Sequence, residues 1–260
     1  MMNRITNLFE TKKNNILSVY FSAGYPQLND TVTIIKTLEK NGVDMVEIGI
    51  PFSDPIADGP VIQTSNDIAL KNGMNLKLLF EQLKDIRNEV SIPLIMMGYL
   101  NPALKFGIEE FCAKCAETGI DGVILPDLPF ELYLKEYKNT FRKNNLHNIF
   151  LIPPQTSNER IKLIDTESEG FLYIVSASSI TGAKKEIQQN QVEYFERINS
   201  LHLKNPTLIG FGISSHQTFE RACEYANGAI IGSAFIKTIE NSKNIEKDIK
   251  EFTSNILEGK

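Results

Sequence analysis

The chain alternates short apolar segments with longer amphipathic ones from end to end. Eight segments are rich in β-branched and aromatic residues and have the length of buried strands: residues 16–21, 44–50, 92–99, 121–126, 148–152, 171–176, 207–213 and 228–232. The stretches between them carry apolar residues at helical spacing, and several end at a Gly or Asn suited to a left-handed cap. Strict alternation indicates a parallel sheet, and eight units predict closure into a (βα)8 TIM barrel.

The alternative is an open, doubly wound sheet, which favours a G-x-G-x-x-G turn after the first strand, whereas this turn reads SAGYP. A length of 260 residues suits one barrel, and no Pro- or Ser-rich linker interrupts it, so a single domain over residues 1–260 is predicted. Residues 2–13 and 244–259 are expected to form extra helices that cover the floor and the seam of the barrel.

Composition argues against several classes of partner. The formal net charge is -5, and Lys and Arg are scattered among acids, so neither nucleic acid nor an anionic membrane is expected to bind. The N-terminal residues lack the apolar run of a signal peptide, and no apolar stretch approaches the ~20 residues that span a bilayer, which predicts a cytoplasmic protein. Cys112 and Cys115 form a C-x-x-C on a predicted helix; without a second such pair they are interpreted as packing residues, and no metal site is expected.

Two carboxylates stand out at the second predicted strand. Glu47 lies within DMVEIGI, where a poorly solvated position would raise its pKa towards that of a general acid; the alternative is a Glu paired with Lys or Arg. The loop PFSDPIADGP follows at once, and its three prolines make it stiff enough to hold Asp58 near Glu47. Asp54 in the same loop could equally form an Asx turn. Two carboxylates at one cavity suit proton transfer without a metal.

Glycines gather after the last three predicted strands, where barrels of this class commonly bind phosphate through backbone N–H groups and a helix N-terminus. These positions are Gly182, Gly210, Gly212, Gly232 and the adjacent Ser233. Simple turn formation is the alternative. Further residues near strand ends that could contact a flat apolar group, or serve only in packing, are Tyr99, Asp127, Tyr173 and Phe211.

The string VEIGIPFSDPIADGPVIQ resembles the second strand and following loop of tryptophan synthase α subunits. The resemblance continues in order through FSAGYP, LIMMGYLNP, GVILPDLP, SITGA, GFGIS and GSAFIK, over essentially the full length. It implies cleavage of indole-3-glycerol phosphate to indole and glyceraldehyde 3-phosphate. It also implies a β subunit that carries pyridoxal phosphate, an α2β2 heterotetramer, and no cofactor in this subunit.

The resemblance also implies roles for individual residues. Glu47 would be the acid and base, and Asp58 would accept a hydrogen bond from the indole N–H. Tyr173 would lie near the reacting centre, and Thr181 would help to position Asp58. Tyr99 and Asp127 would line the site, with Met97, Ile124 and Phe211 on the indole side. The phosphate would be held mainly by main chain at Gly182, Gly212, Ile213, Gly232 and Ser233.

Other parts of the family pattern concern the contact with the β subunit and the closure of a loop over the site. Pro51, Asp54 and the segment YLNPALKFG match the family's β-subunit face. Residues 177–190 are polar and contain glycine, which is the basis for a lid hypothesis. Ala177, Ser178 and Ser179 depart from the bulkier or Gly-containing stretch that many members carry before the Thr-Gly.

Three rival functions stay open. One is a different sugar-phosphate isomerase or lyase, although such barrels tend to use a strand-end Lys and no predicted strand here contains one. Another is a free-standing indole-releasing lyase. The third is a non-catalytic activating subunit, which would have no reason to keep a buried carboxylate.

Overall fold

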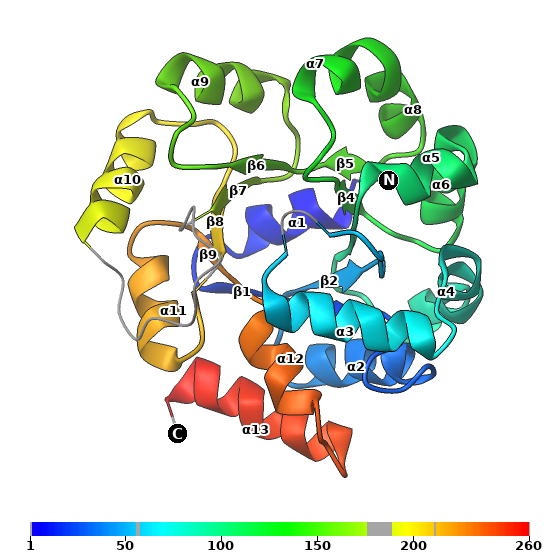
Figure 1. Cartoon of the computed structure of the whole chain (residues 1–260). Coiled ribbons are helices and arrows are strands. Elements are labelled where there is room, and N and C mark those ends of the chain that lie inside the picture. The colour runs from blue at the N-terminus through cyan, green and yellow to red at the C-terminus, as the bar shows by residue number, and fades with distance from the viewer. Residues whose placement is uncertain (1, 56–57, 176–188, 211, 260) are drawn as a thin grey trace.

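The computed structural model describes residues 2–55, 58–175, 189–210 and 212–259, which form a ring of parallel strands surrounded by helices (Figure 1). The hydrogen-bonded strand order is β5-β4-β3-β2-β1-β9-β8-β7-β6. The strands are β1 (Ile16–Ser22), β2 (Met45–Gly49), β3 (Leu94–Met97), β4 (Gly122–Ile124), β5 (His147–Asn148), β6 (Phe150–Ile152), β7 (Leu172–Val175), β8 (Thr207–Gly210) and β9 (Gly228–Ile231). This is the TIM barrel that the alternation predicts.

The fifth predicted strand differs from expectation, because it is two strands separated by Ile149. β5 pairs with β4, and β6 pairs with β7. The backbone N–H of Ile149 donates to the carbonyl of Val123 at 2.9 Å, which continues the β4 side of the ring. This segment therefore meets its two neighbours along different residues, and the ring closes through Ile149.

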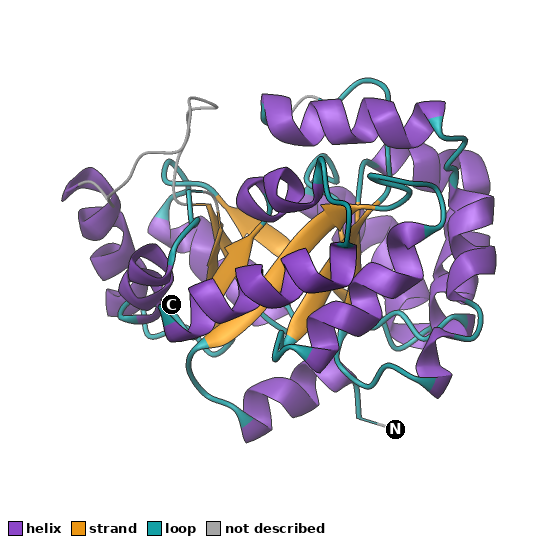
Figure 2. Ribbon diagram, turned by 90° about the horizontal axis from the view of Figure 1, so that it is seen from below, coloured by secondary structure: helices purple, strands orange, loops and turns teal. Residues whose placement is uncertain are grey.

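The helices lie outside the strands, as Figure 2 shows from a direction at 90° to Figure 1. Two predicted helices are each divided: residues 76–90 form α4 and a 3-10 turn η1, and residues 131–145 form α7, a π-helical turn η2 and α8. The helical elements are α1 (Arg4–Thr11), α2 (Asp30–Lys40), α3 (Pro60–Lys71), α4 (Leu76–Leu83), η1 (Ile86–Asn88), α5 (Leu100–Phe106), α6 (Ile108–Glu117), α7 (Phe130–Leu132), η2 (Tyr133–Tyr137), α8 (Lys138–Lys143), α9 (Asn158–Glu167), α10 (Gln189–Ser200), α11 (His216–Cys223), α12 (Ser233–Ile239) and α13 (Ile245–Glu258).

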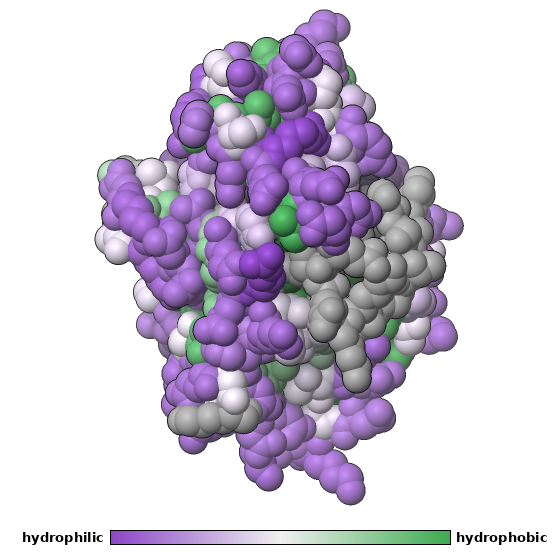
Figure 3. Space-filling model, turned by 90° about the vertical axis from the view of Figure 1, so that its left-hand side faces the viewer, coloured by the Kyte–Doolittle hydropathy of each residue, from purple (hydrophilic) through white to green (hydrophobic). Residues whose placement is uncertain are grey.

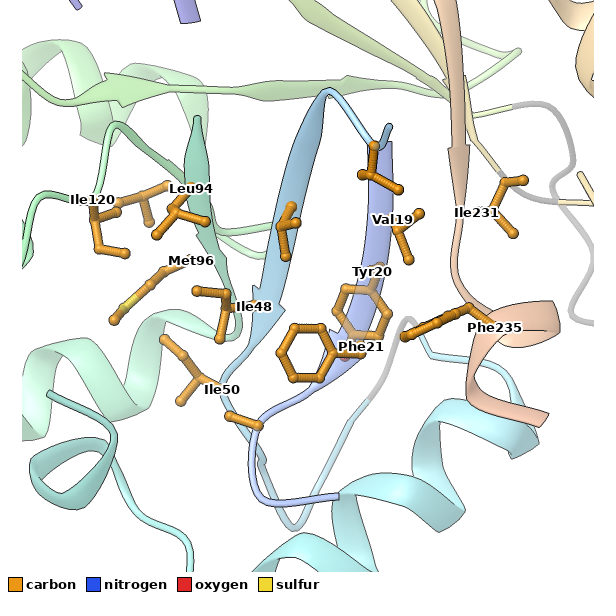
Figure 4. Packing of buried hydrophobic residues seen from close by; sticks show 14 of the residues in the cluster. Val19, Tyr20, Phe21, Ile48, Ile50, Leu94, Met96, Ile120, Ile231 and Phe235 are labelled. Carbon is orange, nitrogen blue, oxygen red and sulfur yellow. The ribbon is translucent and has the colours of Figure 1, made fainter. Parts of the chain in front are cut away.

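Alternate strand residues enter two separate apolar cores, because successive side chains of a strand point to opposite faces. The outer core lies between strands and helices; Figure 4 shows part of it, including Phe21, Ile48 and Met96. Buried Cys115 joins this layer, with its Sγ 3.9 Å from the Met96 Sδ, which agrees with the packing interpretation of the C-x-x-C. The inner core fills the barrel and consists of strand residues together with Ile5 and Phe9 of α1.

The predicted N-terminal helix closes one end of the barrel as α1. The rings of Phe9 and Phe171 lie 5.8 Å apart, which ties the helix to the inner core. Asp121, directly before β4, is buried and bridges Arg4 at 3.0 Å and Arg87 at 2.6 Å. At the other terminus α13 packs on the outside against α2 and α12 (Figure 1).

The surface is mainly hydrophilic on the face drawn in Figure 3. Among the described residues, no helix combines the length and apolarity needed to cross a bilayer. Large exposed apolar side chains in the same ranges are Met2, Leu104 and Leu163.

Candidate active site

Glu47 lies in the middle of β2 and faces the inside of the barrel. It is 0% exposed, as the flanking apolar residues predict, and it pairs in register with Tyr20 of β1. The Ser18 hydroxyl donates to its Oε1 at 2.9 Å. Burial raises the pKa of Glu47 to about 8, and the hydrogen bond from Ser18 partly opposes that shift. Glu47 is therefore a neutral acid near pH 7, and no described Lys or Arg pairs with it.

Asp58 stands immediately before α3, in the proline-rich loop that follows β2. Gly59 caps this helix and Pro60 begins it, and the Gln63 side chain donates to the backbone carbonyl of Asp58 at 2.8 Å. The Asp58 side chain is buried; burial raises its pKa to about 6, and a hydrogen bond with Tyr99 opposes the shift. Asp58 is thus mainly charged at pH 7, whereas Glu47 is mainly neutral.

Two tyrosines fill the barrel above glycines of neighbouring strands. A Cβ at Gly49 would lie 2.4 Å from the Tyr20 hydroxyl, and a Cβ at Gly210 would lie 2.2 Å from the Tyr173 hydroxyl. Burial raises the pKa of Tyr173, and the negative charges of Glu47 and Asp58 add to the shift. These glycines therefore leave the space in which two aromatic rings lie close to both carboxylates.

A small cavity lies beside these groups. It brings together Asp58 and two other expected residues, Met97 and Tyr99. The complete lining is Tyr20, Ile50, Asp58, Asn66, Met97, Gly98, Tyr99 and Pro126.

Several expected residues do not line this cavity, including Glu47 and Tyr173. Ile124 of β4 is buried in the inner core. Asp127 is exposed, and its Oδ1 accepts a hydrogen bond from the backbone N–H of Leu100 at 2.8 Å, at the first residue of α5. Asp127 therefore stabilises the start of α5, next to Tyr99, rather than lining the cavity.

The expected phosphate end follows β8 and β9. Gly212 has φ +84°, which favours glycine, and nothing lies within 4 Å of a Cβ built there. Ile213 is buried, Gly232 caps the N-terminus of α12, and Ser233 is the first residue of that helix. These positions leave backbone N–H groups and the positive end of a short helix at the barrel mouth. Thr181, Gly182, Phe211 and residues 177–188 of the expected lid lie outside the described residues.

The sequence is similar to known proteins over almost its full length. A family model described as tryptophan synthase alpha chain matches residues 6–259. The tryptophan synthase alpha chain of Flavobacterium psychrophilum is 59% identical over 256 residues, which cover 98% of this chain and 100% of that one. The tryptophan synthase alpha chain of Phocaeicola vulgatus is 54% identical over 257 residues, which cover 99% of this chain and 98% of that one. The chain belongs to the tryptophan synthase alpha chain family.

Solved structures agree with this assignment. The crystal structure of the tryptophan synthase alpha chain from Legionella pneumophila subsp. pneumophila has a TM-score of 0.88 at 31% identity and covers 98% of this chain and 96% of its own. Tryptophan synthase from Mycobacterium tuberculosis in space group F222 has a TM-score of 0.88 at 27% identity, with 98% and 97% covered. The TIM barrel is therefore shared with other tryptophan synthase chains.

Sequence reasoning missed several polar residues of the candidate site. Tyr20 faces the cavity, Ser18 binds Glu47, and the Asn66 side chain accepts a hydrogen bond from Ser22 at 2.8 Å. The alternation of β1 carried a usable signal, because Ser18 and Tyr20 share the face of the strand that meets Glu47. Asn66 lies on α3, and nothing in the helix pattern indicates that it reaches the cavity.

Proposed function

We propose that this tryptophan synthase alpha chain cleaves indole-3-glycerol phosphate to indole and glyceraldehyde 3-phosphate by a retro-aldol reaction. The observation that carries the proposal is the convergence of a fully buried Glu47, Asp58 and two aromatic hydroxyl groups on one barrel mouth. The family supplies the identity of the substrate, and the residues supply a route for its protons.

Glu47 acts first as an acid. Its neutral carboxyl group donates a proton to the indole ring carbon that carries the glycerol phosphate chain, and the bond between that carbon and the chain breaks. The resulting carboxylate accepts the proton of the adjacent chain hydroxyl, which becomes the aldehyde of glyceraldehyde 3-phosphate. One proton enters and one leaves, so Glu47 returns to its starting state. A pKa of about 8 keeps it protonated when the reaction begins.

Asp58 acts as the charged partner. Its carboxylate accepts a hydrogen bond from the indole N–H and stabilises the positive charge that develops on the ring during protonation. A pKa of about 6 keeps Asp58 ionised under the conditions in which Glu47 is neutral. Tyr99 donates to Asp58 and so fixes the orientation of the acceptor.

The remaining expected residues bind the substrate. We assign the phosphate to the backbone N–H groups at Gly212, Ile213, Gly232 and Ser233, and the indole ring to the cavity side of Tyr20, Met97 and Tyr99, where aromatic rings offer flat contacts. Tyr173 lies beside the reacting carbons. We keep Ile124 on the indole side and infer that Asp127 contributes to the site through its hydrogen bond with the start of α5, beside Tyr99. Thr181, Gly182 and Phe211, which lie outside the described ranges, keep the roles that the family resemblance gives them.

The experiment is indole release from indole-3-glycerol phosphate by purified wild type, Glu47→Gln and Asp58→Asn. Asp67→Asn, an exposed acid on α3, is the matched control. We expect both site variants to lose most activity and the control to retain it. Wild type that folds but releases no indole, with or without a β subunit, would refute the substrate assignment.

A β subunit is the partner that the family implies, and we propose an α2β2 assembly in which pyridoxal phosphate is bound by the partner. The contact face would include Pro51, Asp54 and α5, on which Leu104 is one of the exposed apolar side chains. Leu104→Asp should reduce stimulation of indole release by added β subunit, while Leu163→Asp on α9 should not. Equal stimulation of both variants would show that α5 is not part of the interface.

A further inference from the structure

The two carboxyl oxygens of Glu47 have different surroundings. Oε1 accepts the hydrogen bond from the Ser18 hydroxyl at 2.9 Å. Oε2 is also buried, but no donor or acceptor in the described part of the chain reaches it. The carboxyl group is thus held at Oε1, whereas the hydrogen-bonding capacity of Oε2 is left unused by the described residues.

Ser18 occupies a layer of the barrel that is otherwise apolar. Its register partners are Met45 on β2 and Ile230 on β9, and both belong to the inner core. Ser18 is 0% exposed, and a buried hydroxyl without a hydrogen-bond partner is unfavourable because it has lost its hydration. Its hydrogen bond with Glu47 provides that partner, whereas packing alone would favour an apolar residue here.

We propose that Ser18 is a positioning residue for Glu47, which holds Oε1 and leaves Oε2 as the oxygen that exchanges a proton with the substrate. The inference rests on the proposed role of Glu47 as the acid and base. The carbonyl oxygen is the better hydrogen-bond acceptor of a neutral carboxyl group, so donation by Ser18 to Oε1 favours the acid in which the proton is on Oε2. Ser18 therefore directs the acidic hydrogen away from the barrel floor.

The same hydrogen bond affects ionisation. A donor to the carboxylate favours the charged form, so loss of the Ser18 hydroxyl should raise the pKa of Glu47 further above its present value of about 8. Two other ionisable groups of the described chain interact with Glu47, namely Tyr20 on β1 and Tyr173 on β7, and both of them also interact with Asp58 before α3. A test must leave all three unchanged.

The sharpest test compares Ser18→Thr with Ser18→Val, because Thr and Val have nearly the same shape and only Thr keeps a hydroxyl. Carboxyl resonances of ¹³C-labelled Glu are followed by NMR as the pH is raised, and the Glu47 signal is assigned by its loss in Glu47→Gln. We expect Ser18→Thr to titrate within a few tenths of a unit of wild type and Ser18→Val about one unit or more higher. Identical titration of the two variants would overturn the proposal.

Kinetics supply the second readout. For Ser18→Val we expect kcat to fall about tenfold with little change in KM, the alkaline limb of the pH profile to move upwards, and Ser18→Thr to restore both. Equal losses in both variants would indicate a packing role and would also overturn the proposal. If added volume prevents folding, Ser18→Ala replaces Ser18→Val, with wild type as its hydroxyl-bearing reference.

Failure of the proposed function is distinguishable from failure of this inference. A wild-type protein that releases no indole, yet shows the NMR difference between Ser18→Val and Ser18→Thr, would refute the substrate and leave the link between Ser18 and Glu47 intact. An active wild type in which Ser18→Val and Ser18→Thr titrate alike would support the substrate assignment and refute the link between Ser18 and Glu47.

Discussion

Replacement of Glu47 by Gln should make the protein more stable at alkaline pH. Burial raises the pKa of Glu47 from 4.5 to about 8 in the folded state. The folded protein therefore binds this proton more tightly than the unfolded chain does. The stability that the proton contributes is fully present below pH 4.5 and is lost as the pH rises through about 8.

The size of this change in the free energy of unfolding follows from the pKa shift of Glu47. One pKa unit corresponds to about 1.36 kcal/mol, so wild type should lose roughly 3–4 kcal/mol relative to Glu47→Gln between pH 5 and pH 8. Gln has nearly the shape of the neutral acid and does not titrate, so other ionisable groups cancel in the comparison. The stabilising effect of a substitution that abolishes activity would be the sign of a site that stores free energy for catalysis.

The assay is urea unfolding followed by circular dichroism at pH 5, 6, 7 and 8. Glu10→Gln, an exposed glutamate on α1, is the control and should parallel wild type at every pH. If the difference between Glu47→Gln and wild type is the same at pH 5 and pH 8, Glu47 does not titrate in this window, and both the burial argument and the acid role are wrong.

Three further predictions concern other parts of the barrel. Because the pKa of Asp58 is raised to about 6, kcat/KM for indole release should fall as the pH drops through about 6, and a flat acid limb in a pH-rate profile would contradict the role of a charged acceptor. Gly210→Ala places a methyl group 2.2 Å from the Tyr173 hydroxyl and should lower the free energy of unfolding by about 1–3 kcal/mol; an unchanged urea midpoint would show that the ring moves freely. Arg87→Met leaves the carboxylate of buried Asp121 with only one arginine and should destabilise by about 3–5 kcal/mol in the same measurement, whereas a loss below 1 kcal/mol would mean that water replaces the ion pair.

Strand positions were predictable because the barrel repeats one simple pattern. Apolar runs mark strands that are buried on both sides, and the burial of Glu47 follows from Val46 and Ile48 beside it. The break at Ile149 could not be predicted, since it depends on where two neighbouring strands align with one short segment. Hydropathy carries no information on that register.

The site was predictable where strand order determines it and not where loops do. Parallel strands bring the ends of β2 and β3 together, so Tyr99 was expected near the site, whereas Met97 was expected only from the family resemblance; both line the cavity with Asp58. Asp127 was expected to line the site, but its short loop turns its carboxylate to the first residue of α5. The contact of Asp121 with Arg4 and Arg87 joins residues far apart in the sequence, and no local pattern reveals it.

The pairing of β1 with β9 has a consequence for synthesis of the chain. Ile16 aligns with Gly228, so one edge of β1 has no strand beside it until more than 200 further residues have been translated. At 5–20 residues per second this interval is roughly 10–40 s. An unpaired strand edge is a template for intermolecular pairing, and the nascent chain therefore passes through a period in which ribosome-bound chaperones have a defined target, the open edge of Ile16–Ser22.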